Sequence, residues 1–575
     1  MKKIYKIFLL PLLALAASGC SDSFLDTDNL TGKDNTNFPL TYAEAQEVLT
    51  SCYEPLMGQW DEPAGNTDFV ANVMSDDCFP GGGSDDRIFH AIGSYKRIDV
   101  NMYATFWRRR YEGIYRCNFL LSVADQIDMT EEQRNQFLGE CHFLRGMYYF
   151  DLARAFENVP LVFSPEPANN PQADPDDLYA QIGADFTQAC ELLPARKFDP
   201  AWNAINLGRA TRWAAEGMLA RAWLFYTGFY GKDSLPVAAT EGETGAVSKA
   251  DIIRYVDDCI ANSGHDLVDD FRNLWAYSYA EGYEYRDSNN LKWVTDDGSN
   301  PEAVFVCHHG VWNNPDWGNY GHNLSVLDYG LRYQDEGAGY GDEGVWPFGA
   351  GWGAGTVTES LYNSFASNDI RRQGSIINVD DPSEGLTYTD NASGQCYDTH
   401  LFIKKYTPIN VHSDNESLTG GTGYCAMALV LYPGYTETDF QVNNLVDFMM
   451  LRFADILLMG AELGGPNAQA YMDRVRSRVG MASVPATLEN IKKERRWELA
   501  FEGVRYYDVL RWHDETVLTA NRSNCKVLNS GVETLISIPF RPETRGFLPI
   551  PQQEIEKSGN ILKQNAGWTD ASCTF

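Results

Sequence analysis

The 575-residue sequence is short of basic residues, and this shortage limits its partners. It holds 46 Lys and Arg against 79 Asp and Glu, a formal net charge of −33. Such an acidic surface repels phosphate backbones, which makes DNA and RNA poor partners. Strongly anionic glycans are disfavoured for the same reason, unless a local basic cleft overrides the average. The hydrophobic share of 44% is that of a folded protein, so disorder is excluded.

Motifs for metal, nucleotide and redox chemistry are missing. The twelve cysteines show no C-x-x-C spacing and the nine histidines no HExxH spacing, so neither a zinc site nor a redox motif is expected. The glycine-rich stretch 349–355 lacks the lysine of a P-loop and is expected to form a flexible turn. Asp380 and Asp381 lie outside any EF-hand spacing. The sequence therefore predicts no cofactor, with calcium as the one option left open.

No hydrophobic run is long enough to span a membrane, and a short one near the start marks an export signal. Three lysines within the first six residues precede an apolar stretch at 7–17. The small residues before Cys20 resemble a lipobox, so we expect a signal peptide over 1–19 and lipidation of Cys20. Simple cleavage beside an incidental cysteine is the alternative. Removing 1–19 takes away three lysines and no acid, which leaves a net charge of −36.

The eleven cysteines after Cys20 are scattered along the chain. An exported protein can form disulfides, but eleven is an odd number and no pairing follows from the spacing. Several of these cysteines lie within helical patterns, where a small buried apolar side chain is the simpler interpretation.

Helical periodicity dominates both ends of the chain. Trp107, Tyr111, Ile114 and Asn118 share one helix face, and 131–156 has the pattern of a single long amphipathic helix. Many such faces combine a large aromatic residue with alanines, which lets helices pack closely in pairs. Pairs of this kind indicate a mainly α, tetratricopeptide-like solenoid, although the strict repeat of about 34 residues is absent. Further helices are expected over 177–193, 215–226, 453–461, 469–479 and 494–512.

The middle of the chain has a different composition. Residues 271–352 are dense in Trp, Tyr, Gly, Asn and Asp and lose the helical period. Short strands are expected at 303–307 and 401–404, and a helix at 359–365. Long loops inside a compact domain are usually functional or disordered, and this many aromatics argue against disorder. We therefore expect the functional surface in this region.

Six stretches, in order along the chain, resemble the SusD/RagB family of surface glycan-binding lipoproteins. One departure is the loop at 463–467, which is shorter than is usual in the family. The stretches are W-x-x-x-Y-x-x-I-x-x-x-N at 107–118, ECHFLRGMYYFDLARAFENVPLV from Glu140, GRATRWAAEGMLARAWLFYTG from Gly208, RFAD followed by LLMGAE at 452–462, ERRWELAFEG-x-RYYD ending in RW at 494–512, and FLPIPQQEIEKSGNILKQNAGW from Phe547.

The resemblance implies an architecture and a role. Tetratricopeptide-like helix pairs would form a right-handed superhelical scaffold over 41–265 and 445–575. An irregular, aromatic-rich insertion at 266–444 would carry the ligand face of this single domain, and 20–40 would be a lipid-anchored tether. Family members lie on the outer face of the outer membrane, bind oligosaccharides or polysaccharides and pass them to a TonB-dependent, SusC-like transporter. They are not enzymes, and some relatives are thought to bind peptides instead.

The aromatic insertion provides candidate ligand residues. A flat Trp or Tyr stacks on the C–H face of a sugar ring, while Asp, Asn and Arg bond its hydroxyls. Residues 312–323 combine these types, and we expect Trp312, Trp317 and Tyr320 to form the platform, with Tyr283 as an outer platform. The alternative for each aromatic is that it packs the insertion against the helices.

A second loop, at 75–87, supplies polar candidates. In the family this region lies beside the aromatic platform, so Asp77 and Arg87 are candidate hydroxyl partners and Tyr95 a candidate stacking partner. An ordinary solvated turn is the alternative, because Gly and Asp favour turns.

A glycoside hydrolase is the rival from another functional class. Glu498 and Glu502 would be its acid pair, but catalytic carboxylates must stand on opposite sides of the scissile bond, roughly 5–9.5 Å apart. Two acids one turn apart on one helix, each three residues from an arginine, are better interpreted as members of an ion-pair network.

Overall fold

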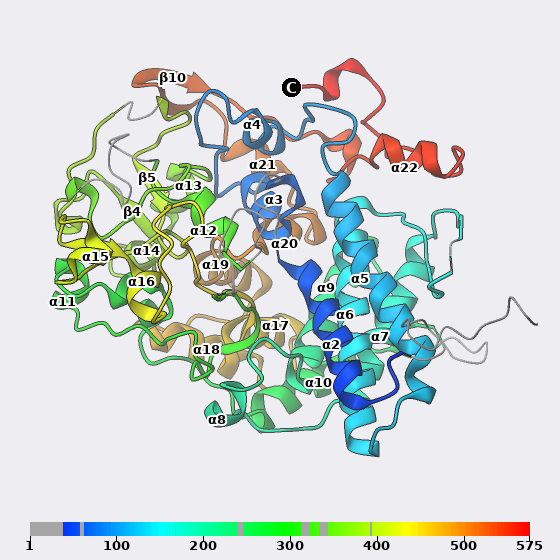
Figure 1. The fold of residues 1–575 in the computed structure, drawn as a ribbon. Helices are drawn as coiled ribbons and strands as arrows, with labels where there is room; N and C mark the ends of the chain where they lie inside the picture. Colours follow the sequence, from blue (N-terminus) through cyan, green and yellow to red (C-terminus); the bar gives the residue numbers. More distant parts are fainter. Residues whose placement is uncertain are drawn as a thin grey trace, which may run out of the picture.

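The computed structural model describes residues 38–57, 63–166, 168–238, 245–311, 321–332, 343–390 and 394–575. Figure 1 shows a helical part on the right and a loop-rich part on the left, with the C-terminal segments crossing the top. Helices predominate, so the mainly α class predicted from the sequence is confirmed.

The first helical block precedes the insertion, and the second follows it. The first contains α2 (Tyr42–Tyr53), α3 (Thr67–Met74), α4 (Arg87–Gly93), α5 (Ala104–Val123), α6 (Glu131–Phe156), α7 (Pro175–Leu192), α8 (Pro200–Asn203), α9 (Arg212–Tyr230) and α10 (Lys249–Asn262). The second contains α17 (Phe453–Leu463), α18 (Ala468–Arg478), α19 (Leu488–Glu498), α20 (Arg505–Arg511), α21 (Thr516–Ala520) and α22 (Gln552–Lys557).

The region between the blocks has only short elements. Its helices are α11 (Glu284–Ser288), α12 (Leu324–Tyr329), α13 (Glu359–Ser364), α14 (Ile370–Ser375), α15 (Glu416–Thr419) and α16 (Met427–Leu431). Its strands are β3 (Ala303–Cys307), β4 (Ile376–Asn378), β5 (Leu401–Ile403), β6 (Asn410–His412), β7 (Tyr424–Ala426) and β8 (Phe448–Arg452). Two further pairs, β1 (Leu235–Val237) with β2 (Gly245–Val247) and β9 (Cys525–Asn529) with β10 (Val532–Ile536), lie in the helical blocks.

Consecutive helices pack against each other as in a solenoid. The packed pairs run α5 with α6, α6 with α7, α7 with α9 and α9 with α10, and α10 then packs on α17 from beyond the insertion. Close approach of α5 and α6 depends on Gly113, because a Cβ there would lie 2.2 Å from a ring carbon of Tyr148. The packing of a large side chain against a small one, expected from the sequence, is therefore present at this contact.

Local signals explain where the long helices start and stop. Thr130 and Gln133 form a capping box at the start of α6, and Ser248 and Asp251 form one at the start of α10. Helix α9 is followed by Gly231, whose left-handed conformation suits a glycine. The expected helix over 131–156 matches α6 at both ends.

The expected helix over 494–512 is wrong. Helix α19 ends at Glu498 and α20 starts at Arg505, with Phe501 at a positive φ of 67° between them. The break lets the two helices face each other, so that Arg495 of α19 pairs with Asp508 of α20 at 2.8 Å.

The cysteines behave as small buried residues. All eleven after Cys20 are free thiols, and ten of them are buried. No helix in the described ranges combines the length and the apolar character that a membrane crossing needs.

Candidate functional site

The pair of strands β3 and β8 fixes the base of the segment that carries most of the predicted platform. These strands are antiparallel, with Cys307 opposite Phe448. Beyond β3, the Gly310 N–H donates to the Gly321 carbonyl at 3.0 Å, and the His309 N–H donates to Asp447 Oδ1 at 2.8 Å. The two ends of segment 311–320 are thus joined to each other and to the scaffold. Rigid bases of this kind are typical of binding loops.

Helix α12 continues from this base and is fixed at its N-terminus. The Asn323 side chain accepts hydrogen bonds from the backbone N–H groups of Ser325 and Val326. Its own amide N–H groups donate to the Val446 carbonyl at 2.8 Å, and its backbone N–H donates to the Asn444 carbonyl at 2.6 Å. One residue therefore caps the helix and joins it to the chain just before β8.

Arg332, which follows α12, organises the other end of this surface. Its guanidinium donates to Asp86 Oδ2 at 3.0 Å and to the Trp352 carbonyl at 3.1 Å, and it lies 5.9 Å from the Trp352 ring. Trp352 is half-buried, and its ring centroid is 5.9 Å from that of Phe440. We refer to Arg332, Trp352, Phe440 and Asp86 as the α12 face.

The glycine-rich stretch 349–355 is not a flexible turn. Gly81 bridges Ala354 and Cys78 bridges Val357, so the stretch is paired through its backbone with the loop after α3. A Cβ at Gly81, whose φ is +67°, would lie 2.2 Å from the Gly353 carbonyl oxygen. Glycine is required here because two backbones approach closely, and this approach fixes the position of Trp352.

Asp77, predicted to contact a ligand, is instead part of the core. It is 1% exposed, and Oδ1 accepts from the Arg496 guanidinium at 2.7 Å. Burial raises the pKa of Asp77 and the neighbouring Asp76 carboxylate adds to the rise, while Arg496 opposes it. The neighbouring Asp76 pairs with Arg505 at 2.8 Å. The loop that we expected to be a solvated turn therefore joins the first helical block to the second through these buried ion pairs.

Tyr95 and Tyr283 are also buried, so neither is an exposed stacking surface. Tyr95 is 2% exposed and donates to the Met74 carbonyl at 2.7 Å. Tyr283 is 2% exposed and donates to Glu384, whose carboxylate also accepts from Lys404 at 2.7 Å. The alternative of a packing role fits Tyr283, whereas Tyr95 is neither a stacking surface nor part of a solvated turn.

Of the remaining predicted ligand residues, the structure describes only Arg87. Arg87 is exposed at the start of α4 and donates to the Phe575 carbonyl at 3.4 Å, close to the α12 face through the adjacent Asp86. Trp312, Trp317 and Tyr320, together with Cys20, lie outside the described residues.

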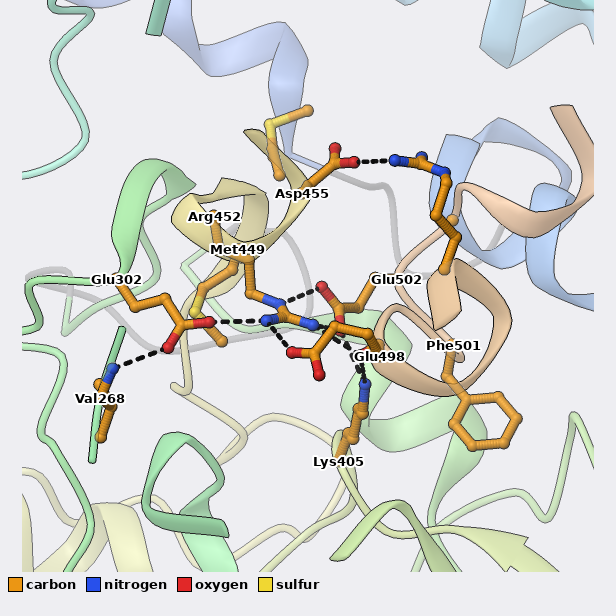
Figure 2. A network of polar contacts seen from close by, with 12 residues as sticks. Val268, Glu302, Lys405, Met449, Arg452, Asp455, Glu498, Phe501 and Glu502 are labelled. Atoms are coloured by element: carbon orange, nitrogen blue, oxygen red, sulfur yellow. Dashed lines mark hydrogen bonds and ion pairs between the residues drawn. The ribbon is translucent and has the colours of Figure 1, made fainter. Parts of the chain in front are cut away.

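The glutamates of the rival catalytic pair lie in a buried ion-pair network around Arg452. Figure 2 shows the Arg452 guanidinium between Glu302 on one side and Glu498 and Glu502 on the other, with Lys405 beneath. Arg452 donates to these three carboxylates at 2.6–2.7 Å, and Lys405 donates to Glu502 at 2.7 Å. The side chains of Arg452, Lys405, Glu302 and Glu498 are fully buried. Glu498 and Glu502 therefore cannot flank a glycosidic bond in this structure.

Charge compensation sets the protonation states in this network. Burial disfavours ionised Glu498, but Arg478, Arg452 and Arg371 outweigh it and hold the pKa of Glu498 well below its usual range. Burial lowers the pKa of Lys405 to about 8, against the opposing effect of Glu502. Among the described residues, no ion pair joins Glu498 to Arg495 or Glu502 to Arg505. Arg495 contacts Asp455 and Asp508 instead, and Arg505 contacts Asp76. Asp508 also pairs with Arg511, three residues further along α20, at 2.8 Å.

A large cleft lies on the helical side of β3. Its volume is about 900 Å³, and its walls come from α2, α5, the loop at 205–209 and the end of β3. Apolar side chains such as Leu49 and Leu207 line it together with arginines and glutamates of α5 and α2. His308 also lines the cleft, and its Nδ1 is 2.8 Å from Asp447 Oδ1. Burial disfavours protonated His308, but the hydrogen bond and charge of Asp447 raise its pKa.

The described part of the chain holds no group of three or more His, Cys, Asp or Glu side chains arranged for a metal ion. Asp380, one of the acids considered for calcium, is 2.9 Å from a ring nitrogen of His400. Asp381 accepts from the Ser383 N–H at the start of a short turn. Both carboxylates thus serve the local structure.

Arg332, Trp352 and Phe440 were not among the predicted site residues. Trp352 stands in the aromatic-rich stretch, but its position depends on the pairing of 349–355 with residues near 80. Phe440 comes from the polar stretch before β8, outside the aromatic-rich residues 271–352. The three residues are far apart in sequence, and only the fold brings them together.

These features define a class: a scaffold of paired helices that holds an aromatic-containing surface built from loops. A model for the SusD family matches residues 273–568, and a second, described as starch-binding and associating with the outer membrane, matches residues 24–224. The chain belongs to the SusD family, as its motifs indicated.

Relatives match over nearly the full length of the chain. SusD-like protein P2 of Formosa agariphila is 24% identical over 99% of this chain and 100% of its own. The solved structure of a laminarin-binding SusD-like protein is 25% identical, with a TM-score of 0.67 over 92% of this chain and 99% of its own. Surface glycan-binding protein A of Bacteroides thetaiotaomicron, solved with laminarihexaose, shares the fold at 22% identity, with a TM-score of 0.67 over 91% of this chain and 99% of its own.

Proposed function

We propose that this protein is a surface-exposed, lipid-anchored glycan-binding protein of the outer membrane. It would capture an oligosaccharide or polysaccharide and pass it to a partner TonB-dependent, SusC-like transporter, without catalysing a reaction itself. The observation that carries this proposal is membership of the SusD family together with near full-length similarity to a solved laminarin-binding relative.

The geometry beside α12 supports binding as the activity. Segment 311–320 starts and ends on a joined base, and its composition combines the aromatic and polar side chains that sugars require. The α12 face adds a half-buried Trp352 next to Arg332 and Asp86. Trp312, Trp317, Tyr320 and Arg87 therefore remain our candidate ligand residues, with Trp352 added to them.

The test is affinity electrophoresis of the mature protein against a panel of neutral and charged polysaccharides, with laminarin included because a relative binds it. We expect retardation by at least one neutral or weakly charged glycan and none by nucleic acid. Release of reducing ends during incubation would show a glycoside hydrolase and overturn the proposal of a pure binding protein.

Peptide binding is the second candidate function, and the cleft beside His308 is the feature that favours it. An apolar floor with both arginine and glutamate on the walls suits a peptide with side chains of both charges. A panel with no retarding glycan, combined with peptides that copurify with the protein, would replace the first proposal with this one.

The lipid anchor is tested separately. We infer that Cys20 becomes the acylated first residue, so Cys20→Ala should release the protein from the membrane fraction of the producing cells. Mass spectrometry of the wild-type N-terminus should show an acylated cysteine, and an unmodified N-terminus beyond residue 20 would contradict the anchor.

A further inference from the structure

A small polar cavity lies beneath the base of segment 311–320. It has room of about 30 Å³ and is bounded by the start of α3, the end of β3 and the start of α12. Asn66, Asp68, Arg110, His309 and Ser325 contribute polar side chains to its lining, beside apolar groups such as Phe448. The cavity thus lies at the junction of the first helical block, the β3–β8 pair and α12.

The unpaired side-chain amide of Asn66 is the first indication that this cavity holds a polar ligand. It is 4% exposed, and neither its amide nitrogen nor its amide oxygen has a hydrogen-bond partner among the described residues. Asn66 occupies the N-cap position of α3, where asparagine normally accepts from the helix, but its side chain makes no capping bond. An asparagine that is buried and bonded to neither helix nor neighbour carries a large desolvation cost.

His309 gives a second, independent sign. It lines the same cavity, is 4% exposed, and its Nδ1 has no hydrogen-bond partner within the part of the chain that the structure describes. Burial, with a smaller effect from His308 and His322, lowers the pKa of His309 to about 3, so the ring is neutral. A neutral imidazole has one donor nitrogen and one acceptor nitrogen, and a ligand able to play either role can satisfy Nδ1.

The other polar groups of the lining are already satisfied. Arg110 donates to Asp151 at 2.9 Å and to the Pro55 carbonyl at 2.8 Å, and the Ser325 hydroxyl donates to Asp68 at 2.5 Å. The groups of the lining that still lack a hydrogen-bond partner are therefore the amide nitrogen and amide oxygen of Asn66 and the Nδ1 atom of His309. Arg110 disfavours a cation in this space, and Asp68 disfavours an anion.

We propose that this cavity is an internal water site, in which one or two ordered water molecules bond Asn66 and His309. The size fits, since about 10–15 Å³ of such room is enough for one water, and the two to four polar partners that a buried water needs are present. The water would join the start of α3 to His309, two residues before segment 311–320. It would therefore help to hold that base in place.

The first arm of the test is a crystal structure of the mature protein that resolves ordered solvent. We expect water density in the cavity within hydrogen-bond distance of the Asn66 amide and His309 Nδ1. An empty cavity would overturn the proposal. So would a feature about 2.4 Å from several oxygens, because that distance indicates a metal ion.

The second arm compares the stability of two variants, Asn66→Leu and Asn66→Ala. Leu has the volume to displace the water and leave His309 Nδ1 unpaired, so we expect the folding equilibrium constant to fall about tenfold relative to wild type. Ala leaves room for water at His309, so its loss should be smaller than that of Leu. A dry cavity gives the opposite order, because Leu would then remove two unpaired atoms and fill the space, whereas Ala would enlarge the void.

Discussion

Arg452 and Arg332 show how the same chemistry produces two different kinds of region. Both arginines meet carboxylates and lie near aromatic rings. Around Arg452 the carboxylates are buried, and every charge has a fixed opposite charge. Around Arg332 the Asp85 side chain is 88% exposed and Trp352 is half-buried. Arg332 itself is only 6% exposed. What separates the core network from the candidate binding surface is therefore the covering of the partner carboxylates, and residue type alone does not reveal it.

The largest loss of stability is expected from Arg452→Met, which removes the central arginine of the buried network. Glu302, Glu498 and Glu502 would all lose their shared guanidinium. Arg478 would still contact Glu302 and Glu498, and Lys405 would still contact Glu502, but the buried cluster would keep one negative charge in excess. Breaking a buried ion pair by removing one partner costs roughly 3–5 kcal/mol. Thermal or urea unfolding should show a large loss of stability, accompanied by loss of glycan binding only where the fold is lost.

A compensated variant sharpens this prediction. Adding Glu498→Gln to Arg452→Met removes the one excess negative charge, while Arg478 keeps Glu302, Arg371 keeps Glu494 and Lys405 keeps Glu502, so part of the lost stability should return. If Arg452→Met alone unfolds like wild type, the network contributes little and the contrast with Arg332 disappears.

The next effect concerns pH, at a second buried pair in the helical scaffold. Burial disfavours ionised Asp185, but the charge of Arg145 and the bond from His142 outweigh it and lower the pKa of Asp185 to about 2. The ordinary value is 3.8, so the stabilisation is complete above about pH 4 and is lost as the pH falls toward 2. The pair should contribute about 2 kcal/mol of this acid-dependent stability.

The measurement is the unfolding free energy of wild type and Asp185→Asn between pH 5 and pH 2. Asparagine cannot titrate, so the variant should be less stable than wild type at pH 5 and should lose less stability on acidification. Parallel pH curves for the two proteins would show that Asp185 has the same pKa folded and unfolded.

The sequence predicted the helical part better than the binding surface, for physical reasons. Helix α6 and strand β3 follow from residues close in sequence, through a capping box and an apolar run, and both matched at their ends. Asp77, Tyr95 and Tyr283 were misjudged because their burial depends on Arg496, Arg522 and Lys404, which lie far away in sequence. The turn expected at 349–355 failed for the same reason, since its partners lie near residue 80.

A pair of tryptophan variants tests the candidate ligand residues of the insertion. Trp317→Ala should weaken glycan binding about tenfold through loss of a stacking contact, while leaving thermal unfolding nearly unchanged. Trp275 is the matched control, because it is buried in the insertion against Phe271 and Tyr406. Trp275→Ala should lower stability by roughly 3–5 kcal/mol. Equal losses of stability and binding in Trp317→Ala would show that Trp317 belongs to the core.

The smallest effect on stability is expected from a substitution on α19, a helix that has both fully buried and exposed charged side chains. Lys493 pairs with Glu489 at 2.8 Å, and both side chains are more than half exposed, whereas Glu494 and Glu498 on the same helix are fully buried. Water and salt screen an exposed pair, and ordering two long side chains offsets the attraction. Lys493→Ala should therefore leave the Tm unchanged within error at both low and high salt. A loss of Tm comparable to that of Arg452→Met would mean that ion pairs on α19 stabilise the protein irrespective of burial, and burial would then no longer explain the difference between the two arginine sites.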